Sequence, residues 1–207
     1  VRGDRSAMDD NLKRLVAVGK EHYESGDYAR AEEWLLAQWR RRKRGDLSKL
    51  SRDKMIAHGV DGSRIVHLPY SIPLEGYEPS YGHQGYAAYV GRLSTGKGLR
   101  TLLDAHGKAP SVVLKIIGTG PLERRLRESA AQEGMRNVEF LGHRSGRELA
   151  DLVRGALFVV VPSECFENSP LTVYESFAHG KAVVGSRIGG IPELVTEGET
   201  GLVFEPG

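Results

Sequence analysis

The sequence predicts an α/β protein in which a parallel sheet carries helices on both faces. From residue 86 onward, short runs rich in β-branched residues alternate with helical stretches, and glycine-rich turns separate them. Two runs, 112–114 and 158–161, are apolar at every position, as in strands that helices cover on both sides. The alternation favours right-handed crossovers between parallel strands, which is the Rossmann-type arrangement.

Six strands are expected in this part of the chain, with a helix after each of the first five. The strand-like runs are residues 86–93, 112–118, 138–142, 157–161, 182–186 and 201–204. The helical stretches are residues 99–108, 122–133, 147–155, 170–179 and 191–196. Because ligands of such sheets bind beyond the carboxyl ends of the strands, the five strand-to-helix loops form the candidate site.

The first 45 residues have a different character. They are charged, lack proline and show two stretches of helical spacing separated by Gly26-Asp27, which predicts a helical hairpin. The turn resembles that of a tetratricopeptide-type pair, but only one unit is present and stacked repeats need about three. The basic run 40–44 either completes a solvated helix end, which is the favoured reading, or contacts anionic lipid head groups.

Residues 46–85 lead from the helical segment into the sheet. A short helix over 47–58 and a strand over 64–68, ended by Pro69, are expected before a loop rich in proline and glycine. The chain is therefore divided into a helical segment (1–45), a transitional segment (46–85) and a Rossmann-like domain (86–207).

The amino-acid composition limits the classes of function that the chain can have. The net charge of the 207 residues is only +2, which argues against a partner nucleic acid. Cys165 is the single cysteine, so no internal disulfide forms, and a structural thiol in a reducing, cytoplasmic compartment is expected. No apolar run approaches the ~20 residues that span a membrane.

The first strand-to-helix loop, residues 91–98, holds two cations. Arg92 and Lys97 straddle a glycine-rich turn, and the helix that starts near Gly98 adds free amides. The planar guanidinium of Arg92 and the mobile ammonium of Lys97 together suit a diphosphate. The Gly-Lys-Ser/Thr order of a Walker motif is absent.

The second, third and fifth loops give weaker signals. Gly118 and Gly120 allow close approach of the backbone to a ligand, or simply a tight turn. A base or ribose could lie over the third loop, near His143 and Arg144. In the fifth loop a surface role is favoured for Arg187 over contact with an anion.

The fourth loop, residues 162–170, combines a helix start with acidic side chains. Ser169 is expected to cap a helix that begins at Pro170, which leaves amides from Asn168 to Leu171 for an anion or a sugar hydroxyl. Glu167 precedes this helix and Glu175 lies inside it; both carboxylates can accept hydrogen bonds from a polyol. The alternative is a capping glutamate plus a surface glutamate.

Several of these segments together resemble the family 4 retaining glycosyltransferases. Residues 90–93 with Lys97-Gly98 are similar to that family's diphosphate-binding loop, and residues 167–175 to its Glu-x7-Glu motif. Three more segments match in order and spacing: residues 140–142, 180–184 and 189–195. The resemblance covers roughly residues 50–207 and implies the C-terminal, donor-binding half of a GT-B fold.

The resemblance also implies roles. The chain would transfer a sugar, as a hexosyltransferase, from a nucleoside diphosphate sugar to an acceptor (glycan, lipid or small molecule) with retained anomeric configuration. Arg92 and Lys97 would hold the diphosphate, Glu167 the transferred sugar, Glu175 the ribose, and the backbone around Arg144 the base. Neither a metal nor another cofactor is expected. The candidate donor-binding residues also include Gly118, Gly120, Asn168, Ser169, Pro170 and Leu171.

Two alternatives stay open: a nucleotide-sugar epimerase of the same fold, and a non-catalytic nucleotide-sugar-binding or scaffold module. The Glu-x7-Glu spacing argues against the epimerase. Because most of an acceptor-binding domain is absent from these residues, the chain alone is expected to turn over poorly.

Overall fold

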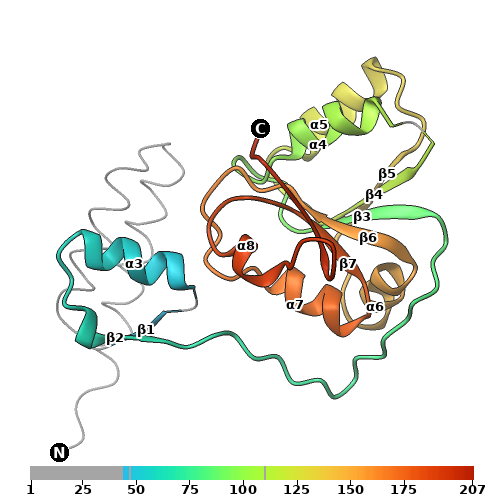
Figure 1. Ribbon diagram of the computed structural model, residues 1–207. Helices are drawn as coiled ribbons and strands as arrows, with labels where there is room; N and C mark the ends of the chain where they lie inside the picture. The colour runs from blue at the N-terminus through green and yellow to red at the C-terminus, as the bar shows by residue number, and fades with distance from the viewer. Residues whose placement is uncertain (1–43, 47, 110) are drawn as a thin grey trace, which may run out of the picture. The chain divides into compact units, whose positions relative to one another are not determined.

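The computed structural model describes residues 44–46, 48–109 and 111–207 (Figure 1). The predicted helical hairpin lies outside these residues, as does most of the basic run. The chain divides into two units, one comprising residues 1–46 and 52–67 and the other residues 47–51 and 68–207. Each is described by itself.

The smaller unit contains a parallel strand pair. Strand β1 (Arg44–Asp46) pairs with β2 (Ile65–His67). Helix α3 (Lys49–Ala57) and the short 3-10 helix η1 (Gly62–Arg64), which the Asp61 side chain caps, lie between them in the chain. The helix and the second strand were predicted. The helix-end reading of the basic run is wrong at Arg44, because non-local pairing with β2 makes this residue part of a strand.

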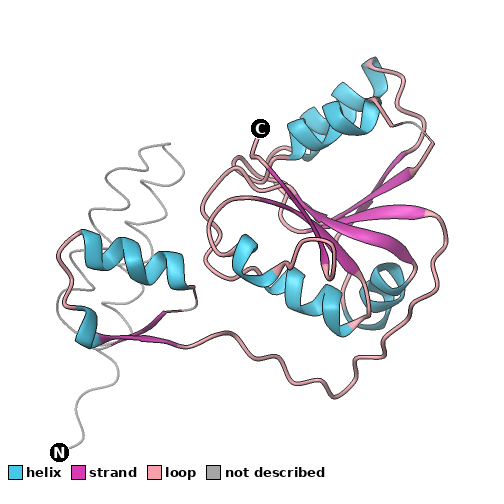
Figure 2. Cartoon of the chain, viewed as in Figure 1, coloured by secondary structure: helices cyan, strands magenta, loops and turns pink. Residues whose placement is uncertain are grey.

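The larger unit is built on a six-stranded, all-parallel sheet in the order β5-β4-β3-β6-β7-β8 (Figure 2). Numbered along the domain, this is the order 3-2-1-4-5-6 of a doubly wound sheet, with its switch point between β3 and β6. The strands are β3 (Tyr86–Val90), β4 (Val113–Ile117), β5 (Val138–Gly142), β6 (Ala156–Val161), β7 (Ala182–Ser186) and β8 (Gly201–Phe204). The predicted Rossmann-like fold is therefore confirmed.

Helices cover both faces of this sheet (Figure 1). On one face lie α4 and α5, and on the other α6, α7 and α8. Their bounds are α4 (Leu99–Gly107), α5 (Glu123–Gln132), α6 (Gly146–Arg154), α7 (Leu171–Ala178) and α8 (Ile191–Leu194). All five were predicted within two residues at each end.

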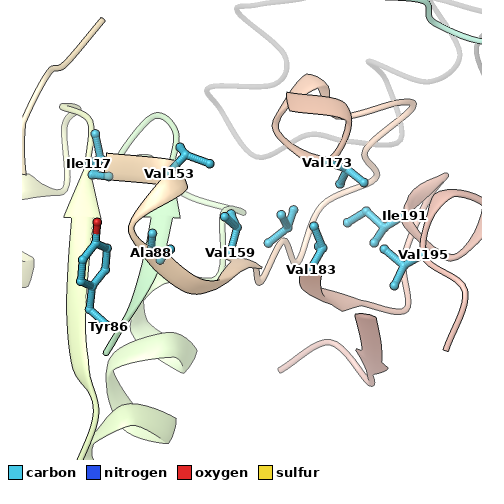
Figure 3. Close-up of a cluster of buried hydrophobic side chains, with 11 residues drawn as sticks. Tyr86, Ala88, Ile117, Val153, Val159, Val173, Val183, Ile191 and Val195 are labelled. Atoms are coloured by element: carbon cyan, nitrogen blue, oxygen red, sulfur yellow. The ribbon is translucent and has the colours of Figure 1, made fainter. Parts of the chain in front are cut away.

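Alternating strand residues divide the core into two layers. Ala87 and Tyr89 of β3 pack with leucines of α4 and α5, whereas Tyr86 and Ala88 face the other helices. Figure 3 shows this second layer, in which Val159 and Val183 of the sheet lie near Val153, Val173 and Ile191 of the three helices. At roughly 1.5–3 kcal/mol for each large apolar side chain buried, the two layers provide most of the stabilisation.

The segment 68–85 follows the ends of α6 and α7. The amide of Ser80 donates to the carbonyl of His179 over 2.9 Å, and that of Gln84 to Gly155 over 2.8 Å. Lys181 is buried and donates to the carbonyl of Gly82. These contacts attach the segment to the face of the domain that carries α6 and α7.

Two local predictions were wrong. The first strand ends at Val90 rather than at residue 93. The amide of Gly91 still donates to the carbonyl of Ile117 over 3.0 Å, and the first loop begins beyond it. Helix α7 begins at Leu171 with Pro170 as its N-cap residue, and no side chain caps it. Ser169 does not cap, since its hydroxyl lies 2.9 Å from the hydroxyl of Tyr174.

No helix in the described ranges is long and apolar enough to cross a membrane. Among those same residues, no group of three or more His, Cys, Asp and Glu side chains is arranged to hold a metal ion.

Candidate functional site

The loops after β3 and β6 meet at the switch point of the sheet. The carbonyl of Gly96 in the first loop accepts hydrogen bonds from the amides of Glu164 (2.7 Å) and Cys165 (3.0 Å) in the fourth. Gly98 makes this approach sterically feasible, because a Cβ at that residue would lie 1.6 Å from the carbonyl oxygen of Pro162. Its φ of 64° is also one that favours glycine.

An ion pair joins these two loops. Lys97 Nζ contacts Oε1 of Glu167, and the two side chains are 29% and 16% exposed. The hydroxyl of Ser163 donates to the same carboxylate oxygen over 2.7 Å. The structure therefore brings together the predicted diphosphate lysine and the predicted sugar carboxylate, which lie 70 residues apart in the sequence.

The backbone of Arg92 is held by a hydrogen bond, and its side chain is exposed. Its carbonyl accepts a 2.9 Å hydrogen bond from Tyr89, a buried phenol whose pKa is raised mainly by that burial. In the part of the chain that the structure describes, the Arg92 guanidinium has no ion-pair partner. The cation can therefore bind an incoming anion without first breaking an internal contact.

The two glycines of the second loop pack against the first loop. A Cβ at Gly118 would lie 1.9 Å from the carbonyl oxygen of Gly91, and one at Gly120 would lie 2.3 Å from that of Leu93. The amide of Leu93 donates to the carbonyl of Thr119 over 2.9 Å. This packing explains why both residues are glycine, because they form a tight turn that supports the first loop. Their contact with a donor remains a prediction.

Glu175 lies in a cavity of about 590 Å³ between α6, α7 and residues 75–78. Val90 at the end of β3 and Thr172 of α7 line it with the carboxylate. Tyr77 contributes a phenol whose pKa is raised by burial and then by the Glu175 carboxylate, and its ring centroid lies 4.8 Å from that of His179. No sequence motif pointed to Tyr77, which lies in the loop segment 68–85.

The third loop presents Arg144 half-buried at a second, smaller cavity of about 350 Å³. Its guanidinium forms an ion pair of 2.6 Å with Glu148, one turn along α6, while His143 is exposed. A surface pair at this spacing contributes only ~0.3–0.5 kcal/mol. Arg144 could therefore exchange this partner for a ligand at small cost.

The fifth loop supports the fourth. The amide of Gly190 donates to the carbonyl of Glu167 over 2.7 Å, and a Cβ at Gly189 would lie 2.1 Å from that same oxygen. The side chain of Asn168 accepts a 2.6 Å hydrogen bond from Ser48. Arg187 is half-exposed and forms ion pairs with Glu197 (3.5 Å) and Glu205 (2.9 Å), which fits the favoured surface role.

Comparison with known proteins assigns the chain to a family. The family model described as "Glycosyl transferases group 1" matches residues 77–207, more than half of the chain. The chain belongs to the group 1 glycosyl transferases. This confirms the family at that level, while membership of family 4 and retention of configuration remain predictions.

Two curated relatives of this glycosyl transferase chain are bacterial enzymes. It is 31% identical to the D-rhamnosyltransferase WbpZ of Pseudomonas aeruginosa, over 95% of this chain and 47% of that protein. It is 33% identical to a GDP-mannose-dependent alpha-mannosyltransferase of Corynebacterium glutamicum, over 72% of this chain and 34% of the relative. The chain thus spans about a third to a half of the length of these relatives.

Solved structures share the fold of this glycosyl transferase chain. Anabaena Alr3699/HepE in complex with UDP and glucose superposes with a TM-score of 0.71 at 23% identity, over 79% of this chain and 49% of that one. TarM gives a TM-score of 0.74 at 16% identity, over 85% and 36%. At such identities the likeness concerns the fold alone.

Sequence reasoning missed two residues that the glycosyl transferase fold brings to the site. Ser163 is buried and bonded to Glu167, and Tyr77 shares the cavity of Glu175. The position of Ser163, next to a buried strand and four residues before the glutamate, was a signal that could have been used. Pro170 is half-buried and Leu171 is 42% exposed at the start of α7, beside these carboxylates.

Proposed function

We propose that this chain is the donor-binding part of a glycosyltransferase that moves a hexosyl group from a nucleoside diphosphate sugar to an acceptor. The observation that carries the proposal is the ion pair between Lys97 and Glu167 at the switch point of the sheet. Arg92 and Lys97 lie on the loop after β3, and Glu167 on the loop after β6. The group 1 family and the donor named for the corynebacterial relative support the same reaction class.

The diphosphate would bind to the cations of the first loop. Lys97 would leave the carboxylate of Glu167 for a phosphoryl oxygen, and Arg92 would add a planar donor fork. As the bond between the sugar and the diphosphate breaks, negative charge grows on the leaving oxygen. Fixed cations and helix N-termini stabilise that charge in the transition state, so neither metal nor cofactor enters the proposal.

The carboxylates would orient the two sugars of the donor. Glu167 would accept hydrogen bonds from hydroxyls of the transferred sugar, and Glu175 from the ribose, whose base would reach the backbone near Arg144. The new bond forms from the acceptor oxygen to the anomeric carbon, with its configuration retained. Asn168, Ser169 and the first turn of α7 would complete this wall of the site.

The acceptor is proposed by class only, as a glycan, a lipid or a small molecule. A single free cysteine is consistent with a reducing cytoplasmic compartment. A peripheral contact with a membrane would rest on the basic run 40–44, most of which lies outside the described residues.

A thermal-shift screen tests the proposal. The chain is heated with UDP-, GDP- and ADP-sugars and with UDP and GDP. AMP, which lacks a diphosphate, is the control. A ligand that binds the native state stabilises it by about 2.7 kcal/mol at a concentration of 100 times its Kd. The expected result is a rise in Tm with one base class and none with AMP. Unchanged Tm values across all nucleotides would refute donor binding.

A further inference from the structure

Ser163 is a buried polar residue for which the proposed function gives no role. It follows β6, is 2% exposed, and donates through Oγ to Oε1 of Glu167 over 2.7 Å. Its carbonyl oxygen accepts a 2.6 Å hydrogen bond from Ser186, whose side chain is fully buried at the end of β7. The serine is therefore held by two neighbouring strands while its hydroxyl reaches the candidate site.

The same carboxylate oxygen also takes the ion pair with Lys97. Within the described ranges, the other oxygen, Oε2, receives no hydrogen bond. One oxygen of Glu167 thus carries both internal contacts and the other remains for a ligand. A carboxylate with one oxygen held and the other available can accept a hydrogen bond from a sugar hydroxyl in one fixed orientation.

The two contacts on Oε1 differ in what they can do when a donor binds. Lys97 is a long, partly exposed side chain on a loop, and its charge is the one proposed to move to the diphosphate. Ser163 cannot make such a move, because its side chain is short and buried and its backbone is bonded to β7. After the lysine leaves, the serine is the remaining hydrogen-bond donor to the carboxylate.

We propose that Ser163 is a positioning residue, which keeps the Glu167 carboxylate aimed at the transferred sugar when the donor diphosphate draws Lys97 away. This inference rests on the proposed function of the site. It assigns Ser186 a supporting part, because the hydroxyl of Ser186 fixes the backbone of Ser163.

The role predicts a selective loss of sugar binding. Calorimetric titration of the 207-residue chain measures Kd for UDP, GDP and ADP and for UDP-glucose, GDP-mannose and ADP-glucose. For the base that binds, Ser163→Ala should weaken the nucleotide-sugar by about tenfold, since a hydrogen bond to a charged group is lost. The affinity for the matching nucleoside diphosphate should stay within about twofold.

A double-mutant cycle separates positioning from a merely structural hydroxyl. Ser163→Ala is combined with Glu167→Ala, which removes the group that the serine is said to orient. In the Glu167→Ala background, Ser163→Ala should cause no further loss of nucleotide-sugar affinity. The matched control is Ser129→Ala on α5, where a serine likewise donates to a glutamate four residues later (Glu133, 3.1 Å) but on another surface.

Three outcomes would overturn the inference. Unchanged nucleotide-sugar affinity in Ser163→Ala would remove the role, and an equal loss for the nucleoside diphosphate would make the role structural. A full additional loss in the Glu167→Ala background would show that the serine acts elsewhere. If the unmodified chain binds none of the six nucleotides, the proposed function itself fails, and that result is distinct from the other three.

Discussion

The carboxylate of Glu167 accepts from Lys97 and Ser163, and the carbonyl of the same residue accepts from Gly190. Three loops thus fix one residue. The ion pair neutralises both charges, so neither is left half-buried without a partner. Exchanging these internal contacts for contacts with the proposed donor would then cost little.

At this scale, Lys97→Ala should affect binding more than folding. The ion pair is partly exposed, so its loss should lower the free energy of unfolding by no more than about 1 kcal/mol. The affinity for a nucleoside diphosphate should fall by about tenfold or more, because a charge-assisted contact disappears. Urea denaturation and calorimetry measure the two effects.

The control for Lys97 is Arg124→Ala, which removes a cation that is 91% exposed on α5 and 3.8 Å from Glu128. It should leave nucleotide affinity unchanged. Equal losses of affinity in both variants would point to a general charge effect and contradict a specific role for Lys97.

Candidate site residues could be named from the sequence, but their contacts could not. Residue type and position pointed to Arg92, Lys97 and Glu167 on loops and to Glu175 inside α7, and their roles toward a donor remain predictions. The sequence could not show that Lys97 pairs with Glu167, because that contact joins side chains 70 residues apart through the packing of two loops. The expected cap at Ser169 failed for a local reason, since its hydroxyl lies 2.9 Å from the hydroxyl of Tyr174, five residues along the chain.

The elements of the larger unit follow from burial and from the glycines at their ends. Strands that helices cover on both sides favour continuous apolar runs, and β6 is apolar throughout. In β4 the apolar run is interrupted by Lys115, whose ammonium lies over the ring of Tyr86. Turns at the switch point need backbone that approaches other backbone closely. Gly98 meets both demands, a positive φ and a missing side chain.

Two glycines with nearly equal φ distinguish the effect of backbone strain from the effect of a steric clash at an added Cβ. Gly98→Ala should lower the free energy of unfolding by about 2 kcal/mol or more, because its Cβ would meet Pro162 as well as strain the backbone. Gly134 has a φ of 67°, and a Cβ added there would meet no atom within 4 Å. Gly134→Ala should therefore cost only about 1 kcal/mol of backbone strain. Urea unfolding of both variants checks the difference, and equal costs would contradict the packing argument.

Element boundaries show how far pattern alone reaches. Residues 138–142, 182–186 and 201–204 were predicted as strands and form β5, β7 and β8. β1 was missed, because three residues beside a basic run show no strand pattern and become a strand only by pairing with β2. Such pairing is a property of the fold, which local propensity does not contain.

Across the whole domain, one topology explains where the chemistry lies. The order β5-β4-β3-β6-β7-β8 reverses direction at β3 and β6, so the loops that follow these two strands border a crevice. Lys97 of one loop and Glu167 of the other form an ion pair there, and Arg92 lies on the same loop as the lysine. The family could be predicted from the sequence because its motifs occupy these loops, whereas the base, the sugar and the acceptor leave no comparable pattern.

The proposed binding of a nucleoside diphosphate sugar in this crevice is tested most directly by a crystal structure of the chain with the nucleotide that stabilises it most. We expect diphosphate oxygens within hydrogen-bond distance of Lys97 and Arg92, with Lys97 released from Glu167 and with Glu175 on the ribose. A nucleotide bound at another surface, or a Lys97–Glu167 pair that persists beside a bound diphosphate, would contradict it.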